Sequence, residues 1–307
     1  MYRILSFDGG GIRGLVTLAM LRKTQDAFPS LISQADLIAG TSTGGIIALG
    51  LAAGKSVDEL ISLYRDNGEE IFDDSWLDNL VDFGKLGGAD YDLGNLKEIL
   101  KDHFGTLKLE SLSKKVLIPS FDLDNEHEDP NKRTWKPIFF HNFPGTDSDG
   151  DRAVVDVALC TSAAPTFFPS HNGYVDGGVV ANNPSMAALT QTQDPRAELD
   201  PRPALGDIRM LSLGTGTILS YIKGKRHNWG YTQWTKPLIN LLLDASMGIA
   251  DYQCRQILRE SYHRLAPVFP PKVNIMMDEW KRSQELIEFG KSADVASTVR
   301  WLQKVGW

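Results

Sequence analysis

The amino-acid sequence predicts an α/β protein with a central, mostly parallel sheet. Short apolar runs alternate with helical segments in a strand–helix–strand–helix order, which is typical of parallel sheets. Two of these runs lead directly into glycine-rich turns that precede helices. The 307 residues, of which 42% are apolar and 23% charged, suffice for a large buried core. Because no internal repeat or long linker interrupts them, we expect one domain over residues 1–307.

Two strand–turn–helix units open the chain. Residues 3–7 form a short apolar run that predicts a buried strand, and the turn DGGG follows it. Residues 15–28 carry apolar side chains at positions that suit a helix packed on a sheet. A second strand is expected at 36–39, followed at once by GTSTGG and by the helical stretch IIALGLAAG at 46–54.

The later elements are expected in both classes. The remaining strands are predicted at 115–123, 135–142, 173–178 and 207–216. The remaining helices are predicted at 57–72, 95–104, 154–165, most of 236–261, and the end of the chain from Asp278 to Trp307. Acidic, glycine-rich loops at 122–131 and 145–152 separate these elements.

Ser42 is the candidate nucleophile, at the centre of the pattern G-x-S-x-G. The pattern alone is common, but here an apolar strand precedes it and a helix of small residues follows it. That context predicts a nucleophile elbow, a sharp strand-to-helix turn that exposes the serine hydroxyl. Gly40 and Gly44 remove side chains that would collide in so tight a turn. The alternative is an ordinary serine at a glycine-rich helix start.

A second glycine-rich turn, DGGGIRG, also lies between a strand and a helix, at 8–14. Acyl transfer needs donors for the oxyanion of a tetrahedral intermediate, and adjacent backbone N–H groups supply them. We choose Gly10 and Gly11 as these donors. Arg13 either meets a phosphate or carboxylate of the substrate, or pairs with Asp8 or another acid and braces the loop.

The same turn satisfies G-x-G-x-x-G through Gly9, Gly11 and Gly14, a pattern that also occurs in dinucleotide sites. Such a site needs an acidic residue at the carboxyl end of the second strand. Asp36 stands at the start of that strand, and GTSTGG occupies its end. We therefore favour acyl transfer and keep the nucleotide site as an alternative.

Asp176 is the candidate base. The six histidines lie in no triad pattern, and His171 precedes a strand instead of following one. Asp176 ends a short apolar strand, and Gly177 and Gly178 follow it, so its carboxylate can project at the rim of the sheet. An aspartate in a glycine turn is usually structural. Here two other loops suited to catalysis follow strands in the same way.

At this point the chain resembles the patatin-like phospholipase family of lipid acyl hydrolases. The resemblance rests on four segments in the family's order, DGGGIRG at 8–14, GTSTGG at 40–45, TSAAPTFFP at 161–169 and VDGGVVANNP at 175–184. It implies a three-layer α/β/α fold, an oxyanion loop at Gly9 to Gly11, the nucleophile Ser42 and the dyad base Asp176. It also implies phospholipase A, lysophospholipase or broader acyl-ester hydrolysis, without a metal at the catalytic centre.

The resemblance covers residues 3–215, and the mainly helical remainder, 216–307, carries no matching motif. A direct Ser–Asp pair needs a stronger base than a free aspartate, whose pKa is about 3.9. We therefore expect Asp176 to be largely desolvated. An acyl channel can be lined by Phe72, Trp76, Phe167 and Phe168, although each also suits an ordinary core position.

The charge pattern restricts the partners. A net charge of −7 argues against nucleic acid and against general attraction to anionic membranes. The segment Lys223 to Lys236 is an exception, with four basic residues, no acid, and the aromatics Trp229, Tyr231 and Trp234. It is either a solvated loop or one that rests on a lipid interface.

The compartment is expected to be the cytoplasm, because no secretory pattern opens the chain and two distant cysteines suit a reducing environment. No run of eighteen apolar residues occurs, so contact with a phospholipid membrane would be peripheral. We expect no cofactor. The acidic loop TDSDGD lacks the glycine and the final acid of a calcium loop.

Overall fold

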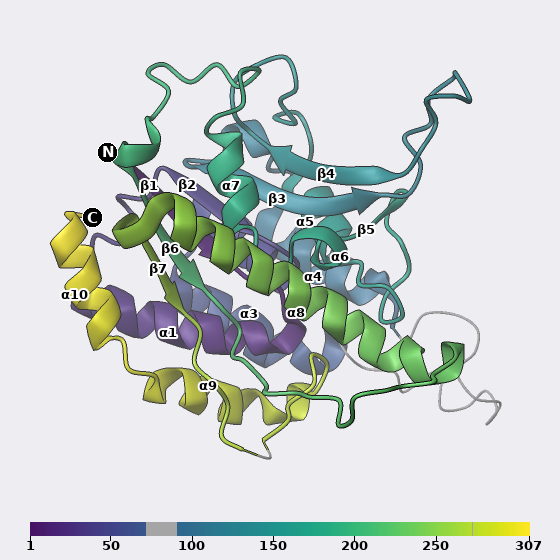
Figure 1. The fold of residues 1–307 in the computed structure, drawn as a ribbon. Coiled ribbons are helices and arrows are strands. Elements are labelled where there is room, and N and C mark those ends of the chain that lie inside the picture. The colour runs from purple at the N-terminus through teal and green to yellow at the C-terminus, as the bar shows by residue number, and fades with distance from the viewer. Residues whose placement is uncertain (72–90, 272) are drawn as a thin grey trace.

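The computed structural model describes residues 1–71, 91–271 and 273–307. Within them, seven strands form one sheet in the order β4–β3–β2–β1–β6–β7, with β5 paired to β3 (Figure 1). The strands are β1 (Tyr2–Phe7), β2 (Leu37–Gly40), β3 (Lys115–Asp122), β4 (Lys136–His141), β5 (Tyr174–Asp176), β6 (Ile208–Leu213) and β7 (Tyr262–Leu265). Only β4 and β5 are antiparallel to their neighbour, so the mostly parallel sheet is confirmed.

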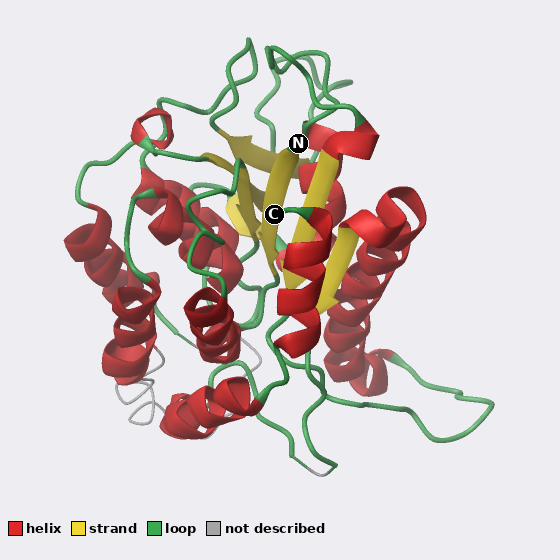
Figure 2. Ribbon diagram, turned by 90° about the vertical axis from the view of Figure 1, so that its left-hand side faces the viewer, coloured by secondary structure: helices red, strands yellow, loops and turns green. Residues whose placement is uncertain are grey.

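Successive residues of the strands face two separate cores. In β1, Leu5 and Phe7 belong to the larger core and Ile4 to the smaller one, and all three are fully buried. The helices of the larger core are α1 (Gly14–Ala27), α2 (Thr43–Ala52), α3 (Val57–Ile71), α4 (Leu93–Phe104), α5 (Val154–Ser162), α9 (Ser283–Ser292) and α10 (Ala296–Val305). On the other face lie α7 (Ser185–Gln191) and α8 (Tyr231–Leu258) (Figures 1 and 2). These three layers confirm the architecture that the resemblance implied.

Several boundaries differ from the predictions. The final helix is divided into α9 and α10 at 293–295, and α8 begins five residues before the expected start at 236. Helix α5 ends at Ser162, before the proline at 165 that disfavours further helix. Strand β7 and helix α7 are absent from the predictions, because both are short and lack a clear apolar period.

The ends of β1 and β2 place two glycine-rich turns together. The two strands are parallel, and Phe7 lies opposite Gly40. The turn after β1 leads through the 3-10 helix η1 (Gly11–Arg13) into α1, and the turn after β2 leads into α2. Both turns therefore lie at the same edge of the sheet, the carboxyl edge at which sites of α/β proteins form.

Candidate active site

Ser42 stands between β2 and α2 in a backbone conformation that L-residues rarely adopt, with φ 54° and ψ −123°. Its N–H donates to Thr161 Oγ1 at 3.0 Å, and the Thr161 hydroxyl donates to the Pro119 carbonyl at 2.5 Å. Thr161 is fully buried, so this chain of hydrogen bonds fixes the turn to β3. The geometry is that of a nucleophile elbow.

The glycines around the elbow allow the backbone segments to touch. A Cβ on Gly40 would collide with the carbonyl of Gly44, and a Cβ on Gly44 would collide with the carbonyl of Phe7. A Cβ on Gly14 would collide with the Thr43 side chain, which ties the two glycine-rich turns together. The close approach of α2 to β1 thus excludes side chains at these positions.

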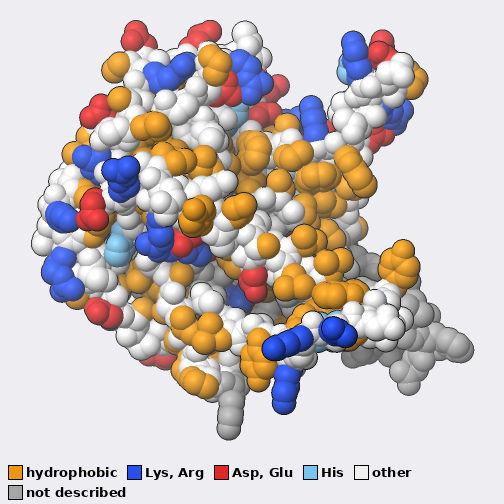
Figure 3. Space-filling view, in the orientation of Figure 1, with side chains coloured by type: hydrophobic (Ala, Val, Ile, Leu, Met, Phe, Trp, Pro, Cys, Tyr) orange, Lys and Arg blue, Asp and Glu red, His pale blue; other side chains and the backbone are white. Residues whose placement is uncertain are grey.

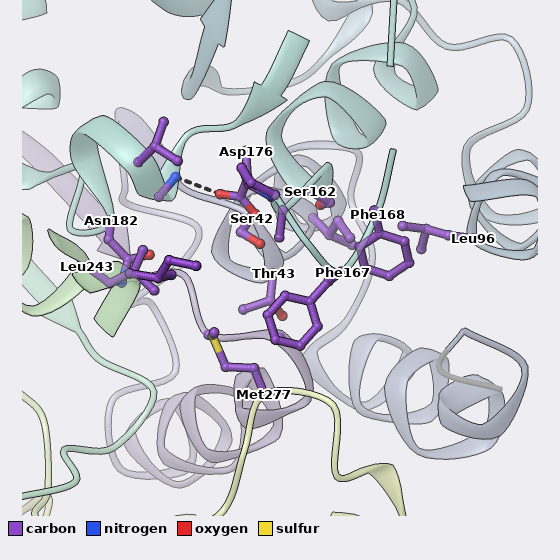
Figure 4. Close-up of a pocket in the computed structure, with 18 of the residues that line it drawn as sticks. Ser42, Thr43, Leu96, Ser162, Phe167, Phe168, Asp176, Asn182, Leu243 and Met277 are labelled. Carbon is purple, nitrogen blue, oxygen red and sulfur yellow. Dashed lines mark hydrogen bonds between the residues drawn. The ribbon is translucent and has the colours of Figure 1, made fainter. Parts of the chain in front are cut away.

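Asp176 lies beside Ser42 at the rim of the same cavity (Figure 4). The residue is only 5% exposed, in agreement with the expected desolvation, and its carboxylate accepts the Gly178 N–H at 2.6 Å. Burial raises the pKa of Asp176 to about 6, and hydrogen bonds from the Ser42 side chain and the Gly178 N–H oppose this rise. At neutral pH the carboxylate is ionised yet more basic than a solvated one.

The route by which Asp176 reaches the site differs from the sequence argument, which treated its strand like the two parallel ones. Strand β5 runs antiparallel to β3 and places Asp176 opposite Ser120, two residues before the end of β3. Gly177 then turns away so closely that a Cβ there would collide with the Pro119 carbonyl. A short strand that enters from the rim therefore delivers the carboxylate to the carboxyl edge.

Two residues of the first glycine-rich turn, Gly10 and Gly11, line the cavity. The Gly9 N–H donates to the Asn182 carbonyl at 2.9 Å and the Ile12 N–H to the Met277 carbonyl at 2.8 Å. Among the described residues, the N–H groups of Gly10 and Gly11 have no acceptor, and both residues line the cavity with Ser42. Gly9 therefore anchors the turn, and the candidate oxyanion donors reduce to Gly10 and Gly11.

Asp8 is held from the C-terminal part of the chain. Arg264, on β7, donates to both carboxylate oxygens of Asp8, at 2.5 and 3.1 Å, and to Ser212 Oγ at 2.8 Å. Of the two alternatives for an acidic partner of Arg13, Asp8 or another acid, the first is wrong, because Arg264 occupies the Asp8 carboxylate. Burial lowers the pKa of Arg13, and the nearby charge of Asp244 opposes this effect. Arg13 is not among the residues that line the cavity.

The cavity beyond Ser42 has apolar walls. Phe167 and Phe168 line it, as the sequence suggested, whereas Phe72 and Trp76 lie outside the described residues. Its other apolar lining residues are Ile46, Tyr64, Ile71, Leu96, Ala164, Pro165, Val179, Ile239, Leu242, Leu243 and Met277. Such a cavity suits a hydrocarbon chain whose ester carbonyl lies near Ser42.

The described cavity-lining residues include no histidine, and His171 is bound to Asp156 instead, at 3.2 Å. Asp36 accepts the Arg3 N–H at 2.7 Å, at the opposite end of β2 from the glycine turns, so it cannot serve a nucleotide there. No cluster of three or more potential metal ligands occurs in the described part of the chain. None of its helices is both long and apolar enough to span a bilayer.

Four residues that hold the two glycine-rich turns in place were not predicted from the sequence. Thr161 and Asn182 lie inside the motif segments, and only their contacts with Ser42 and Gly9 identify them. Arg264 and Met277 lie beyond residue 215, where no motif was found. Their contacts cross more than 250 residues of chain, so no local pattern marks them.

The chain is similar to a known family over most of its length. The model described as "Patatin-like phospholipase" matches residues 5–189. A "cGAMP-activated phospholipase" of Pseudomonas aeruginosa is 33% identical over 273 residues, which cover 86% of this chain and 78% of that protein. A protein of the same description from Escherichia coli is 37% identical, over 69% of this chain and 62% of its own length.

A third relative and a solved structure extend the comparison. The "Putative sporulation hydrolase CotR" of Bacillus subtilis is 34% identical over 75% of this chain and 67% of its own length. The solved human GIVD cytosolic phospholipase A2 aligns with 99% of this chain and 58% of its own, at 11% identity and a TM-score of 0.39. At that TM-score the structural likeness carries no argument about the site.

Proposed function

The chain belongs to the patatin-like phospholipase family, and from this premise we propose that it hydrolyses lipid acyl esters through a Ser42–Asp176 dyad. The observation that carries the proposal is the position of Ser42. It stands on an elbow beside a desolvated carboxylate, at an apolar cavity that Gly10 and Gly11 also line, and the N–H groups of these glycines have no acceptor among the described residues. Nucleophile, base, oxyanion donors and acyl site thus meet within one cavity.

The proposed reaction has two stages and uses only groups of the chain. Asp176 accepts the Ser42 proton while Oγ attacks the ester carbonyl, a role for which a pKa of about 6 suits the carboxylate. Gly10 and Gly11 bind the oxyanion. The protonated carboxyl then returns its proton to the leaving alcohol, and water hydrolyses the acyl-enzyme by the same steps in reverse.

The proposed substrates are phospholipids or lysophospholipids. The apolar walls around Phe167 and Leu243 support a long acyl chain, since a short soluble ester would leave most of that surface exposed to water. A non-lipid carboxylesterase of the same fold is the alternative. Rates over a series of ester chain lengths, compared with rates on phospholipid vesicles, distinguish the two.

A fluorophosphonate probe tests the nucleophile. We expect one adduct, located on Ser42 by mass spectrometry, and no adduct in Ser42→Ala. Ser162→Ala is the matched control, because Ser162 also lines the cavity and should leave labelling intact. An adduct on another residue, or active protein without any adduct, would contradict the proposal.

We also propose that the protein is cytoplasmic. Cys160 and Cys254 are both buried and unpaired, and burial raises the pKa of each thiol to about 12. Such cysteines are inert and suit a reducing compartment.

A further inference from the structure

The first half of α8 exposes apolar side chains. From Pro237 to Ala250 the helix carries a single charged residue, Asp244. Leu238, Leu241, Leu242 and Ile249 follow helical spacing and are 47%, 44%, 53% and 58% exposed. Figure 3 shows hydrophobic side chains gathered along the part of the molecule where Figure 1 places this helix.

The second half of the helix is different. Its inward residues Ala250, Cys254 and Leu258 are buried against the sheet, and its outer face carries the ion pair of Arg255 with Asp251 at 2.9 Å. This half is amphipathic, as expected for a helix on a globular surface. Tyr252 and Ile257 of this half are also exposed, at 64% and 42%. Only the part of α8 before Asp244, however, contributes residues that line the cavity of Ser42.

A basic loop adjoins the apolar half. Lys223, Lys225 and Arg226 are exposed, and no acidic residue occurs between Asp207 and Asp244, although the chain carries a net charge of −7. Trp229 packs edge-on against Trp234 of the first turn of α8, with ring centroids 5.0 Å apart, which holds the loop to the helix. Figure 1 shows the segment before α8 running beneath the first half of the helix.

The exposed surface continues into the cavity of Ser42. Leu242 is 53% exposed and also lines the cavity, as does Val179 at 41%. Ile239 and Leu243, on the inner side of α8, line it further. A molecule in contact with the outer face of α8 thus meets the cavity entrance without crossing a polar rim at these residues.

We propose that this surface docks the protein on an anionic lipid bilayer and presents lipid to Ser42. The docking surface comprises Leu238, Leu241, Leu242 and Ile249 of α8 with Lys223, Lys225 and Arg226 of the loop. The apolar side chains enter the headgroup region and the basic ones meet anionic headgroups. The second step, delivery of lipid to Ser42, rests on the proposed hydrolase function.

Charge favours a bilayer over a second copy of the chain. In a two-fold dimer the same patch faces itself, so the three basic residues of each loop would meet a surface whose segment from 208 to 249 supplies one acid, Asp244. Exposed Tyr221 and Tyr231, at 86% and 96%, have the amphipathic rings that concentrate at membrane interfaces. An anionic membrane satisfies both the apolar and the basic parts of the surface.

Vesicle flotation with the Ser42→Ala variant of residues 1–307 tests the docking without hydrolysis. We expect binding to vesicles of phosphatidylcholine with phosphatidylglycerol that exceeds binding to phosphatidylcholine alone and that weakens with salt. Replacing Lys223, Lys225 and Arg226 by Gln should weaken the anionic preference by about 100-fold, since each basic residue near such a surface contributes about fivefold. Leu238→Glu with Leu241→Glu should abolish binding to both vesicles.

Matched controls carry the same charge changes elsewhere. Lys108, Lys291 and Arg300, all exposed, are replaced by Gln, and Leu107 and Leu205, 37% and 46% exposed, by Glu. Both control proteins should bind as the parent does, and circular dichroism verifies that every variant is folded. Equal binding by docking and control variants overturns the proposal.

Two further outcomes separate this proposal from the proposed function. If the parent protein is labelled at Ser42 but the Ser42→Ala protein does not float with anionic vesicles, the proposed function stands and the docking is refuted. If the Ser42→Ala protein floats as expected but the parent protein gives no Ser42 adduct, the docking stands and the proposed function is refuted. A dimer in light scattering that Leu238→Glu with Leu241→Glu dissociates, without any vesicle binding, assigns the surface to a second copy and also refutes the docking.

Discussion

Ser42 adopts an unfavourable backbone conformation, and Asp176 keeps a carboxylate away from water. Neither state stabilises the folded chain, so each must be maintained by its surroundings. For Ser42 these are Thr161 and the glycines that pack the elbow. For Asp176 the Gly178 N–H and the Ser42 side chain replace part of the lost hydration.

The raised pKa of Asp176 predicts an acid limb in the rate profile. Only the ionised carboxylate accepts the Ser42 proton, and its pKa is about 6. The value of kcat/KM on a soluble ester should therefore fall about tenfold per pH unit below that value. If kcat/KM fell only below about pH 4, the range of a solvated carboxyl, the role of buried Asp176 as base would be contradicted.

The same pKa predicts a stability effect of opposite sign. A folded-state pKa above the ordinary 3.8 means that the contribution of Asp176 is full below that pH and is lost as pH rises through about 6. Asp176→Asn should thus raise the free energy of unfolding at pH 7 by up to about 3 kcal/mol, and much less at pH 4. Urea unfolding at both pH values measures this, with the exposed Asp151→Asn as control.

The sequence predicted the residue types of the site better than its hydrogen bonds. The elbow and the carboxylate follow from local patterns, because glycine, serine and aspartate are constrained by the turns themselves. Which N–H groups of the glycine loop are hydrogen-bonded, and which have no acceptor, does not follow from local patterns. Gly9 differs from Gly10 and Gly11 only because the Asn182 carbonyl, more than 170 residues away, accepts its N–H.

At the scale of elements, β7 connects the C-terminal part of the chain to the glycine-rich turn at 8–14, which holds the proposed oxyanion donors. It is a four-residue edge strand with two polar residues at its centre, so its pattern does not identify it as a strand. One of these, Arg264, has a side chain only 12% exposed and pairs with the 1% exposed Asp8. This pair fixes the residue that immediately precedes Gly9.

Arg264→Gln should therefore impair both stability and catalysis. It leaves the Asp8 charge buried without its partner, at a cost of about 3–5 kcal/mol. A displaced oxyanion loop should lower kcat by about 10- to 100-fold with little change in KM. Rates normalised to fluorophosphonate-titrated sites separate the two effects, because a purely structural role reduces the number of sites and not kcat per site.

Two variants control for this result. Arg264→Lys keeps the charge but not the bidentate hydrogen bonds to Asp8. It should therefore recover part of the kcat and of the stability that Arg264→Gln loses. Arg133→Gln removes an exposed partner of Asp124 and should change stability by about 1 kcal/mol or less. Unchanged kcat per titrated site in Arg264→Gln would refute the positioning role.

For the whole molecule, the segment beyond the family match is packed into the same body. Helix α9 lies so close to α1 that a Cβ on Gly290 would collide with Val16 and Ala19. The Trp307 indole N–H donates to the Leu31 carbonyl at 3.0 Å, and Met277 holds the oxyanion loop through Ile12. The helices here were predicted from apolar spacing, but their partners were not, since packing between distant elements leaves no local pattern.

We therefore predict that residues 1–307 unfold as one cooperative unit. Trp307→Ala, at a side chain 4% exposed, should lower the free energy of unfolding by about 3–5 kcal/mol. Because α9, β7 and the glycine loop are joined, loss of Ser42 labelling and loss of far-UV ellipticity should occur at the same urea concentration, in the variant as in the parent. Trp135→Ala, at a residue 68% exposed, should leave the free energy of unfolding within about 0.5 kcal/mol of the parent's. Labelling that survives a first, separate transition would instead make the C-terminal segment an independent unit, and Arg264 and Met277 would then be dispensable for the oxyanion loop.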